Sequence, residues 1–428
     1  MDTDMKGYLQ KLPEAVQGLV KLAGETAASR GGSIYLVGGF VRDLLLRVDN
    51  LDLDFVVESD AIAFAESMSL HLKAKLTRHK RFGTATVTTA DGFKMDFATS
   101  RTESYPQPAH LPVVSPGLLK DDLRRRDFTI NTMALEITPS GFGRLIDFFS
   151  GKEDLKYRRI RVLHDLSFID DPTRILRAVR FEQRYGFNIE KRTLRLLKEA
   201  ASGNMLSAVQ PQRTRDELIL FFKEREPVRY VRRLNNLYGF GFLHPKLKIN
   251  KTTFKLLACV SKEVRHFRDV YAKRRRLDAW LIYLGAILDR LKAKEINSVC
   301  RKFGFSGGET KRILSCKTVS PQIKRQLLKK PMRPSRICRL LEPLSYETIV
   351  FISAKHGEKI IRKRISDFLS VYNGVKTHVN GEDLKKLGLK PGPGYQKIFS
   401  FILDARIDGK VKTKDEELYL IKKLVKIK

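Results

Sequence analysis

Cysteine is scarce in this chain of 428 residues, which has four: Cys259, Cys300, Cys316 and Cys338. None stands in a CxxC or Cys/His spacing, so the sequence offers neither a zinc site nor a disulfide framework. Long apolar runs are missing too, because no segment approaches the roughly 18 residues of a membrane-spanning helix. The first residues lack the apolar core of a signal peptide. We therefore expect a cytoplasmic protein with no membrane partner.

Negative charge is also in short supply. Lys and Arg number 82 against 48 Asp and Glu, which gives a formal net charge of +34 and a pI near 10. Solubility does not require so large an excess, so the charge indicates a polyanionic partner. Nucleic acid fits better than a membrane surface, because neither terminus carries an amphipathic anchor. The eight histidines form no clustered His-Asp pattern, which argues against a phosphohydrolase.

The first 150 residues alternate strand-like and helix-like segments, as in a mixed α/β unit. Helical periodicity predicts a helix over residues 61–76. The Pro-rich segment 103–120 is too interrupted by proline for a helix or a central strand, so we expect a long loop there. Short runs rich in Val, Ile, Phe and Thr predict strands at residues 33–39, 51–58, 84–89 and 93–99.

After about residue 160, amphipathic helical segments dominate to the C-terminus. A chain of this length holds two or three packed units. We expect an α+β multidomain protein with a head at 1–155, an all-α neck at 156–270, and an elongated basic helical body and tail at 271–428. Basic residues recur in this helical part in four runs, at 272–278, 323–330, 358–366 and 421–428.

The sharpest local pattern is YLVGGFVRD, followed at short range by LDLDF. Gly38 and Gly39 close a predicted strand and open a helix, which leaves bare backbone N–H groups where phosphates can approach closely. Arg42 and Asp43 then lie in the first turn of that helix. For the double glycine alone, an ordinary strand-to-helix turn is the alternative.

Two aspartates follow this turn at a spacing that suits metal ions. Asp52 and Asp54 are two residues apart on a predicted strand, so both carboxylates project from one face. Acidic side chains in an apolar strand are costly to bury unless they are paired or bind a metal. The pair predicts a site for two Mg²⁺ ions that activate an attacking hydroxyl and neutralise a triphosphate. Asp96 is a candidate third ligand, and an exposed edge strand is the alternative for the pair.

Together these motifs resemble the class II tRNA nucleotidyltransferases, the family of bacterial CCA-adding enzymes and poly(A) polymerases. The resemblance covers roughly residues 33–225, where several spaced motifs occur in the family's order, and returns in the stretch VNGEDLKKLGLKPGPGY. It implies a polymerase-β-like nucleotidyltransferase head, a neck that reads the nucleotide, and a body and tail that bind tRNA. It also implies Mg²⁺ as cofactor and CTP and/or ATP as substrates.

The second family motif is DLRRRDFTINTMA. Its residues Arg125, Arg126, Asp127 and Asn131 correspond to those that hold the ribose and phosphates of the nucleotide in the family. Guanidinium groups suit phosphate recognition, and Asn131 is four residues beyond Asp127, on one face of a possible helix. A solvated charged turn is the alternative.

Two further motifs resemble supporting parts of the family. LIDFFSGKEDL is similar to the connector between head and neck, and we interpret Asp147 and Asp154 as structural. QPQRTRDELILFF is similar to the helix that braces the nucleotide pocket, in which Arg213 and Glu217 can pair at i and i+4. Gln212 stands where the family commonly has an acid, and a plain surface helix is the alternative.

The motif DDPTRILRAVRF bears on the choice of base. We interpret Asp171 and Pro172 as the N-cap and first residue of a helix, with Arg174 on the same side. Cytosine and adenine each present an amino donor beside a ring-nitrogen acceptor. An aspartate that accepts beside an arginine that donates therefore complements both bases and mismatches uracil and guanine. In the family the corresponding residues act as this template; a capped helix with an acid-base pair is the alternative.

Three neighbours complete the candidate nucleotide site. Asp170 stands where the family usually has Glu, and Arg177 and Arg180 lie further along the same predicted helix.

The leading hypothesis is an enzyme that adds C and/or A to the tRNA 3′ end. Its alternatives are a poly(A) polymerase of the same class, or a non-catalytic RNA-binding protein on a degenerate fold, which the intact aspartate pair argues against. Some family members divide the work, one enzyme adding CC and another adding A; residues 170–187 and the Pro-rich segment resemble this subgroup, and of the two activities the resemblance favours CC addition. The oligomeric state stays open.

Overall fold

The computed structural model describes residues 5–271 and 276–425. The predicted basic runs that begin at residue 272 and at residue 421 therefore lie partly outside the described residues. Two compact units make up the fold. The first comprises residues 1–218 with 236–238, and the second comprises residues 219–235 with 239–428. Helices α10 (Pro211–Lys223) and α11 (Pro227–Leu237) each contribute residues to both units.

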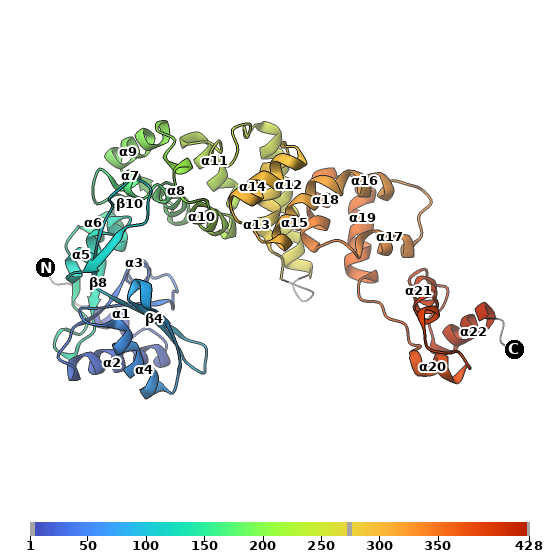
Figure 1. Ribbon diagram of the computed structural model, residues 1–428, viewed down its shortest axis with the longest axis horizontal. Coiled ribbons are helices and arrows are strands. Elements are labelled where there is room, and N and C mark those ends of the chain that lie inside the picture. Colours follow the sequence, from blue (N-terminus) through green and yellow to red (C-terminus); the bar gives the residue numbers. More distant parts are fainter. Residues whose placement is uncertain (1–4, 272–275, 426–428) are drawn as a thin grey trace. The chain divides into compact units, whose positions relative to one another are not determined.

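A seven-stranded mixed sheet forms the centre of the N-terminal unit (Figure 1). Its strand order is β3-β4-β5-β2-β1-β8-β9; β2 and β5 run parallel, and all other neighbours run antiparallel. The mixed sheet expected for the head is confirmed. The strands are β1 (Ile34–Val37), β2 (Leu53–Val57), β3 (Lys75–His79), β4 (Thr84–Thr88), β5 (Lys94–Thr99), β8 (Met133–Glu136) and β9 (Leu145–Asp147).

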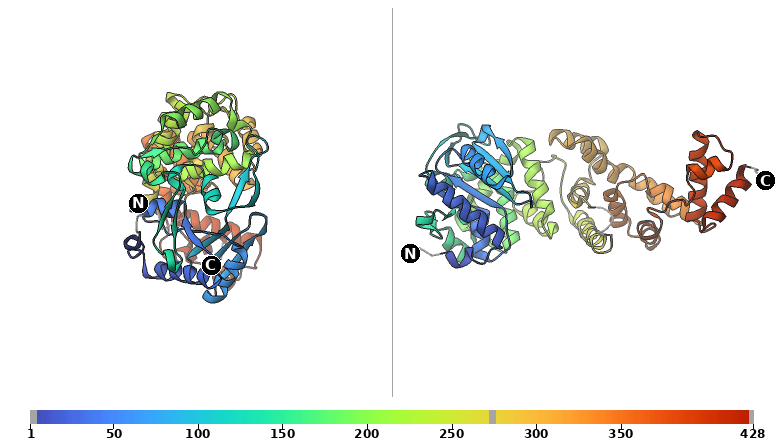
Figure 2. Two further views of the ribbon diagram at one scale, coloured as in Figure 1. Left: turned by 90° about the vertical axis from the view of Figure 1, so that its left-hand side faces the viewer. Right: turned by 90° about the horizontal axis from the view of Figure 1, so that it is seen from below.

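Helices α2 (Glu14–Ser29) and α4 (Ala61–Leu72) pack on this sheet (Figures 1 and 2). The ring of Phe64 in α4 lies 5.4 Å from that of Phe97 in β5, which stacks on Phe55 of β2 at 4.9 Å. Alternate residues of a strand point to opposite faces. The two buried phenylalanines therefore leave their neighbours Asp54 and Asp96 on the other face. Packing on one side of the sheet thus positions the carboxylates on the other.

The other elements of this unit surround the sheet or follow it along the chain. They are α1 (Lys6–Leu9), α3 (Gly39–Leu46), η1 (Lys80–Phe82), β6 (Arg101–Ser104), β7 (Val113–Pro116), α5 (Leu119–Arg124), η2 (Thr129–Asn131), η3 (Pro139–Gly141), α6 (Gly151–Lys156), β10 (Arg159–Ile160), α7 (Ser167–Asp170), α8 (Thr173–Tyr185), β11 (Asn188–Ile189), α9 (Lys191–Ser202), η4 (Met205–Ser207) and α10 (Pro211–Lys223).

Several local expectations are wrong. The segment 103–120 is not one long loop, because β6 and β7 pair antiparallel into a two-stranded sheet and α5 begins at Leu119. The helix expected over 61–76 ends at Leu72, and Lys73 adopts a left-handed conformation that turns the chain into β3. Asn131 lies in a 3₁₀ turn rather than on an α-helix. Strands β8 and β9 were not predicted, because their residues were interpreted only as parts of motifs.

The second unit is helical. Helix α13 (Ala279–Leu288) is buried along its whole length and packs against α12, α15 and α18. Of the described residues, no helix is long and apolar enough to cross a membrane. The helices are α11 (Pro227–Leu237), α12 (Lys251–Tyr271), α13, α14 (Ala293–Lys302), α15 (Gly307–Thr318), α16 (Ser320–Leu327), α17 (Pro334–Leu341), α18 (Tyr346–His356), α19 (Lys359–Asp367), the π-helix η5 (Phe368–Tyr372), α20 (Gly381–Lys386), α21 (Pro393–Ile407) and α22 (Lys414–Val425).

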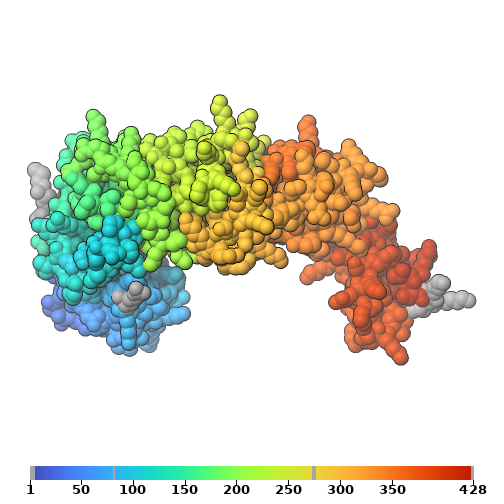
Figure 3. Space-filling model, turned by 45° about the horizontal axis from the view of Figure 1, so that its top comes forward, coloured from blue at the N-terminus to red at the C-terminus, as the bar shows by residue number. Residues whose placement is uncertain are grey.

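The last three helices, red in Figure 3, enclose a small core of their own. Leu384 of α20, Ile402 of α21 and Ile421 of α22 are all fully buried in it. The carboxylate of Glu417 is buried beside this core and accepts hydrogen bonds from the backbone of His378 and Val379. The C-terminal motif found in the sequence therefore forms a packed helical element.

Candidate active site

The turn between β1 and α3 brings the backbone close to an arginine of another segment. Gly38 has a φ of 68°, and a Cβ atom there would lie 2.6 Å from Nη1 of Arg126. Only glycine meets both conditions without strain. In α3, the buried Arg42 donates from Nε and Nη2 to the carboxylate of Asp43, at 2.8 and 2.9 Å, and from Nη1 to Oδ1 of Asn131 at 2.6 Å. The predicted phosphate turn is thus joined to the second predicted motif.

The aspartate pair lies beside this turn. Asp54 is in β2, and Asp52 directly precedes the strand rather than lying in it. In the parallel register, Asp54 is the partner of Asp96 in β5. Burial raises the pKa of Asp54 to about 6. The positive charge of Arg126 lowers this pKa, and the negative charges of Asp96 and Asp52 raise it further. Negative charge is therefore concentrated at Asp54.

These carboxylates fit a divalent cation. Mg²⁺ prefers oxygen ligands, and its charge would relieve the repulsion at Asp54. Asp96 is exposed, and its Oδ1 accepts the hydroxyl hydrogen of Thr86. Across residues 5–271 and 276–425, no three His, Cys, Asp or Glu side chains form a ready metal-binding group. Asp52 and Asp54 are the candidate ligands, and a metal-binding role for Asp96 stays a prediction.

Asp122, a buried aspartate that the sequence analysis did not select, binds two of the predicted arginines. Asp122 in α5 is fully buried, and it accepts from Nη2 of Arg125 at 2.7 Å and from Nη2 of Arg126 at 2.9 Å. Burial opposes the charge of Asp122, but the two guanidinium groups outweigh it and lower the pKa of its carboxyl. Asp122 therefore stays ionised and fixes both arginines. Its spacing of three and four residues from them is a helical signal that was present in the sequence.

Asp127 links the same motif to helix α8. Its Oδ1 accepts from Nδ2 of Asn131 at 2.8 Å, and its Oδ2 lies 2.8 Å from Nη2 of Arg177. Burial works against the carboxylate, but Arg177 and Asn131 stabilise it and lower its pKa to about 2. The predicted polar residues thus form one buried hydrogen-bonded network.

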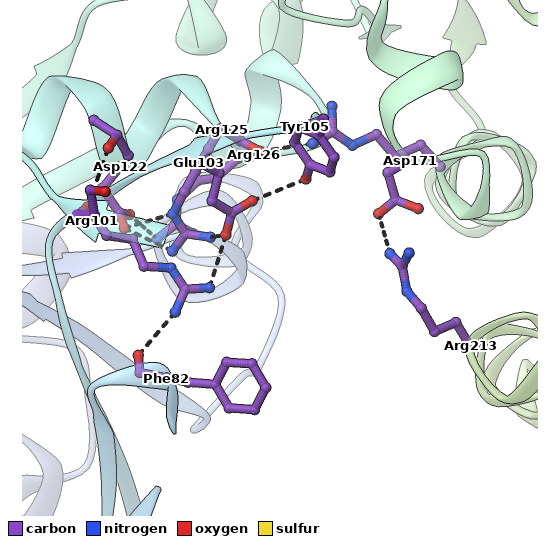
Figure 4. A network of polar contacts seen from close by, with 12 residues as sticks. Phe82, Arg101, Glu103, Tyr105, Asp122, Arg125, Arg126, Asp171 and Arg213 are labelled. Carbon is purple, nitrogen blue, oxygen red and sulfur yellow. Dashed lines mark hydrogen bonds and ion pairs between the residues drawn. The ribbon is translucent and has the colours of Figure 1, made fainter. Parts of the chain in front are cut away.

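The hairpin β6–β7 contributes residues that the sequence analysis missed. Glu103 accepts hydrogen bonds from Arg101 at 2.9 Å, from Arg125 at 3.0 Å and from the hydroxyl of Tyr105 at 3.0 Å. Figure 4 shows Glu103 between the arginines, with Tyr105 on the side that faces Asp171. The partners of Glu103 include a residue 22 positions away in the sequence, so no local pattern pointed to it.

The predicted base-reading pair lies at the start of α8. The N-cap of α8 is Pro172 and the helix begins at Thr173, one residue later than expected; Asp171 supports this start, because its Oδ1 accepts from the backbone N and the hydroxyl of Thr173, at 3.1 and 2.6 Å. The buried Arg174 donates to Oγ of Ser167 at 2.7 Å and to the carbonyl of Arg125 at 2.8 Å. The two residues are neighbours, yet the structure pairs each with other groups.

Helix α10 braces this pair in a way that differs from the expectation. Oδ2 of Asp171 lies 2.8 Å from Nη2 of Arg213 (Figure 4), so Arg213 does not pair with Glu217. Glu217 instead binds Arg177 at 2.9 Å and Arg180 at 3.3 Å. The expected i, i+4 pair does not form, because each of its side chains has another partner of opposite charge: Arg213 has Asp171, and Glu217 has two arginines of α8.

Three further predicted residues have structural contacts. Asp170 lies 3.9 Å from Nδ1 of His164. Asp147 accepts from the backbone N of Gly151 and Lys152, at 2.8 and 2.9 Å, and so caps α6. Asp154 is buried and accepts from Thr129 and Arg161, both at 2.6 Å. These contacts agree with the structural interpretation of Asp147 and Asp154.

The motifs open into one cavity of about 720 Å³ within the N-terminal unit. All predicted catalytic and nucleotide-binding residues line it except Asp96 and Asp170. Glu103, Tyr105, Phe181 and Arg184 are lining residues that the sequence analysis did not select. The cavity is lined by Gly38, Gly39, Arg42, Asp43, Asp49, Asn50, Leu51, Asp52, Asp54, Glu103, Tyr105, Arg125, Arg126, Asp127, Asn131, Asp171, Arg174, Arg177, Arg180, Phe181 and Arg184.

A glycine turn beside an aspartate pair on a mixed sheet, facing a set of fixed arginines, is the arrangement that a nucleotidyltransferase needs. Comparisons with known proteins identify the family. The model of the poly(A) polymerase head domain matches residues 34–161, and that of a probable RNA- and SrmB-binding site of polymerase A matches residues 186–249. The chain belongs to the tRNA nucleotidyltransferase and poly(A) polymerase family.

Similar proteins are named for addition of nucleotides to tRNA. The A-adding tRNA nucleotidyltransferase of Geobacter sulfurreducens is 36% identical over 96% of this chain, which spans 47% of that relative's length. The A-adding enzyme of Halalkalibacterium halodurans is 31% identical over 94% of this chain and 90% of its own. The solved structure of the Thermotoga maritima CCA-adding enzyme complexed with tRNA is 31% identical, covers 99% of both chains and has a TM-score of 0.74.

Proposed function

We propose that this chain adds A to the 3′ end of tRNA from ATP, with Mg²⁺ as its cofactor. The observation that carries the proposal is the shared cavity, into which the Gly38 turn, the Asp52/Asp54 pair and the Asp171/Arg174 pair all open. We favour addition of A over addition of CC because relatives named A-adding match more than nine tenths of the chain. The sequence alone had favoured CC addition.

Phosphate binding follows from the fixed arginines. Asp122 holds Arg125 and Arg126 in place, and Arg126 lies directly over Gly38. A triphosphate on this turn would meet backbone N–H groups and guanidinium donors together. Asp52 and Asp54 would hold Mg²⁺, which when bound neutralises the triphosphate and activates the attacking 3′ hydroxyl.

Base choice is assigned to Asp171 and Arg174. Arg213 and the N-terminus of α8 keep the Asp171 carboxylate in place, while Ser167 and a backbone carbonyl keep the Arg174 guanidinium in place. A carboxylate that accepts and a guanidinium that donates complement adenine and cytosine but not uracil or guanine. Size and further contacts must then separate adenine from cytosine.

The tRNA partner is supported by charge. The net charge of +34 favours a polyanion, and exposed lysines such as Lys329, Lys330, Lys359 and Lys363 lie in the helical unit. A protein that acts on tRNA is expected in the cytoplasm, in line with the sequence analysis.

The test is incorporation into three tRNA substrates that end before CCA, after C and after CC, each offered ATP, CTP, UTP and GTP separately. We expect a single A to enter the substrate that ends in CC, and chelation of divalent cations to stop the reaction. Entry of C into the shorter substrates would identify CC or CCA addition instead. Repeated addition of A to any RNA would identify a poly(A) polymerase.

A further inference from the structure

A nucleobase bound in the cavity needs an apolar surface to stack on, and the cavity offers few. Most of its lining side chains are charged or polar. Base faces gain most from aromatic rings, which bind them without regard to hydrogen-bonding pattern. The aromatic lining residues are Phe181 and Tyr105. One of these two rings is therefore the candidate for stacking.

Phe181 is already covered. It is buried, and the guanidinium carbons of Arg42, Arg177 and Arg180 lie 5.2, 5.4 and 5.2 Å from its ring centroid. Arg42 and Arg177 are fixed in turn by Asn131 and by Asp127. A base cannot reach Phe181 unless this network is dismantled.

Tyr105 is placed differently. It lines the cavity together with Asp171 and Arg174, and Figure 4 shows its ring on the side of Glu103 that faces Asp171. Its hydroxyl donates to Oε2 of Glu103 at 3.0 Å, which ties the ring to the carboxylate that also holds Arg125. Burial and the charge of Glu103 raise the pKa of Tyr105, so the phenol stays a neutral donor.

The loop that carries Tyr105 is anchored against the base-reading helices. The backbone N of Ala109 donates to the carbonyl of Ile169 in α7 at 3.0 Å, and Ala109 is 2% exposed. Helix α7 ends at Asp170, next to Asp171. The hairpin is therefore held at both ends of the tyrosine, by Glu103 before it and by Ala109 after it.

We propose that Tyr105 is the residue on which the base of the incoming nucleotide stacks, and that it favours adenine over cytosine. This inference rests on the proposed function and assigns to it the step that Asp171 and Arg174 leave open. Both bases satisfy the hydrogen-bonding pair, but the two rings of adenine cover more of a tyrosine ring than the single ring of cytosine. Glu103 acts as a positioning residue that keeps the tyrosine ring in place.

The test compares Tyr105→Ala with Tyr105→Phe in the full chain, with Tyr157→Ala as the matched control. Tyr157 is 51% exposed, belongs to the same unit and does not line the cavity. Loss of one base-aromatic stack is expected to raise KM for ATP about tenfold. The inhibition constant of CTP against ATP should rise less, and KM for tRNA should not change. Tyr105→Phe should keep most of the ATP preference, and Tyr157→Ala should behave as the unaltered chain.

A second measurement reads stacking without turnover. The triphosphate of formycin, a fluorescent isomer of adenosine that keeps the amino group beside the ring nitrogen, is titrated with each protein, and its emission should change with the unaltered chain and with Tyr105→Phe but not with Tyr105→Ala. An emission change that persists in Tyr105→Ala, or that is lost equally in the Ala and Phe variants, would overturn the role of the ring. If the unaltered chain changes the emission of the probe but transfers no nucleotide to tRNA, the proposed function fails and the stacking role stands.

Discussion

Asp171 and Arg213 form an ion pair of 2.8 Å that joins the start of α8 to α10. The pair holds the carboxylate at the cavity that Arg174 also lines, which is the position that the proposed contact with an exocyclic amino group requires. Arg213, which the sequence suggested as a partner of Glu217, therefore holds Asp171 instead, and any role of Asp171 in base choice depends on this ion pair.

Replacing Asp171 with Ala should relax base choice. The group that penalises the uracil carbonyl is lost, and one charge-assisted hydrogen bond is worth about 1.5 to 3 kcal/mol, so selectivity for ATP over UTP should fall by roughly tenfold to over a hundredfold. Arg213→Ala should produce a smaller loss, because the carboxylate remains but is no longer held. Incorporation of all four nucleotides and a melting curve check this. A lower melting temperature with unchanged preference would leave Asp171 only a structural role at the start of α8.

Removal of either aspartate of the pair should stop catalysis without releasing the RNA. Asp52→Ala or Asp54→Ala should abolish nucleotide transfer, because metal coordination is lost, while tRNA affinity stays within about twofold. Asp91→Ala, in an exposed turn before β5, is the control. Single-turnover assays and filter binding measure the two effects, and near-normal turnover by both pair variants would refute the metal assignment.

A methyl group at Gly38 should weaken nucleotide binding. Gly38→Ala forces a positive φ on alanine and places its Cβ against Arg126, 2.6 Å from Nη1 in the present geometry. The arginine must move, so KM for ATP should rise at least tenfold, while KM for tRNA changes little. Gly92→Ala, which also has a positive φ but meets no neighbour, separates backbone strain from loss of the phosphate site.

The Asp127 network should show a defined dependence on pH. The folded pKa of Asp127 is about 2, below its ordinary value near 3.8, so its stabilisation is complete above about pH 4 and disappears as pH falls through 2. Asp127→Asn should therefore melt below the unaltered chain at pH 6, and the gap should narrow between pH 4 and pH 2. Denaturation curves across this range test the sign. A gap that widens on acidification would contradict the ion pair with Arg177.

RNA affinity should fall steeply with salt, because binding releases counterions from the phosphate backbone. Replacing Lys329, Lys330, Lys359 and Lys363 with Ala should reduce the slope of log affinity against log salt by about 1 for each phosphate that these lysines no longer bind. Lys75→Ala with Lys94→Ala, in strands of the N-terminal unit, is the control. An unchanged slope in the fourfold variant would move the RNA-binding surface elsewhere.

Local patterns in the sequence were enough to find the residues whose roles depend on nearby residues in the chain. Gly38 was identifiable because a strand-to-helix turn requires it, and Asp54 because a period of two sets it apart from Phe55. Glu103 and Tyr105 could not be identified in this way, because their contacts involve Arg125 and the cavity that Asp171 lines. The fold brings these later segments to the hairpin. The β6–β7 hairpin was not predicted, because the prolines between residues 103 and 120 argued against a strand. Asp122 is the residue that a search for i, i+3 and i, i+4 partners would have recovered.

Arg42 spans three segments at once, since it binds Asn131, lies 4.8 Å from the ring centroid of Tyr185 and shares Asp43 with the Tyr185 hydroxyl. An engineer who wished to transplant the catalytic part of this protein could not cut at residue 155, because α8 would be left behind with half of the arginine's partners. A chimaera that exchanges residues 1–218 as one block keeps these interactions. A library that varies α3 should accordingly vary Tyr185 of α8 with it, because both helices contribute to these contacts.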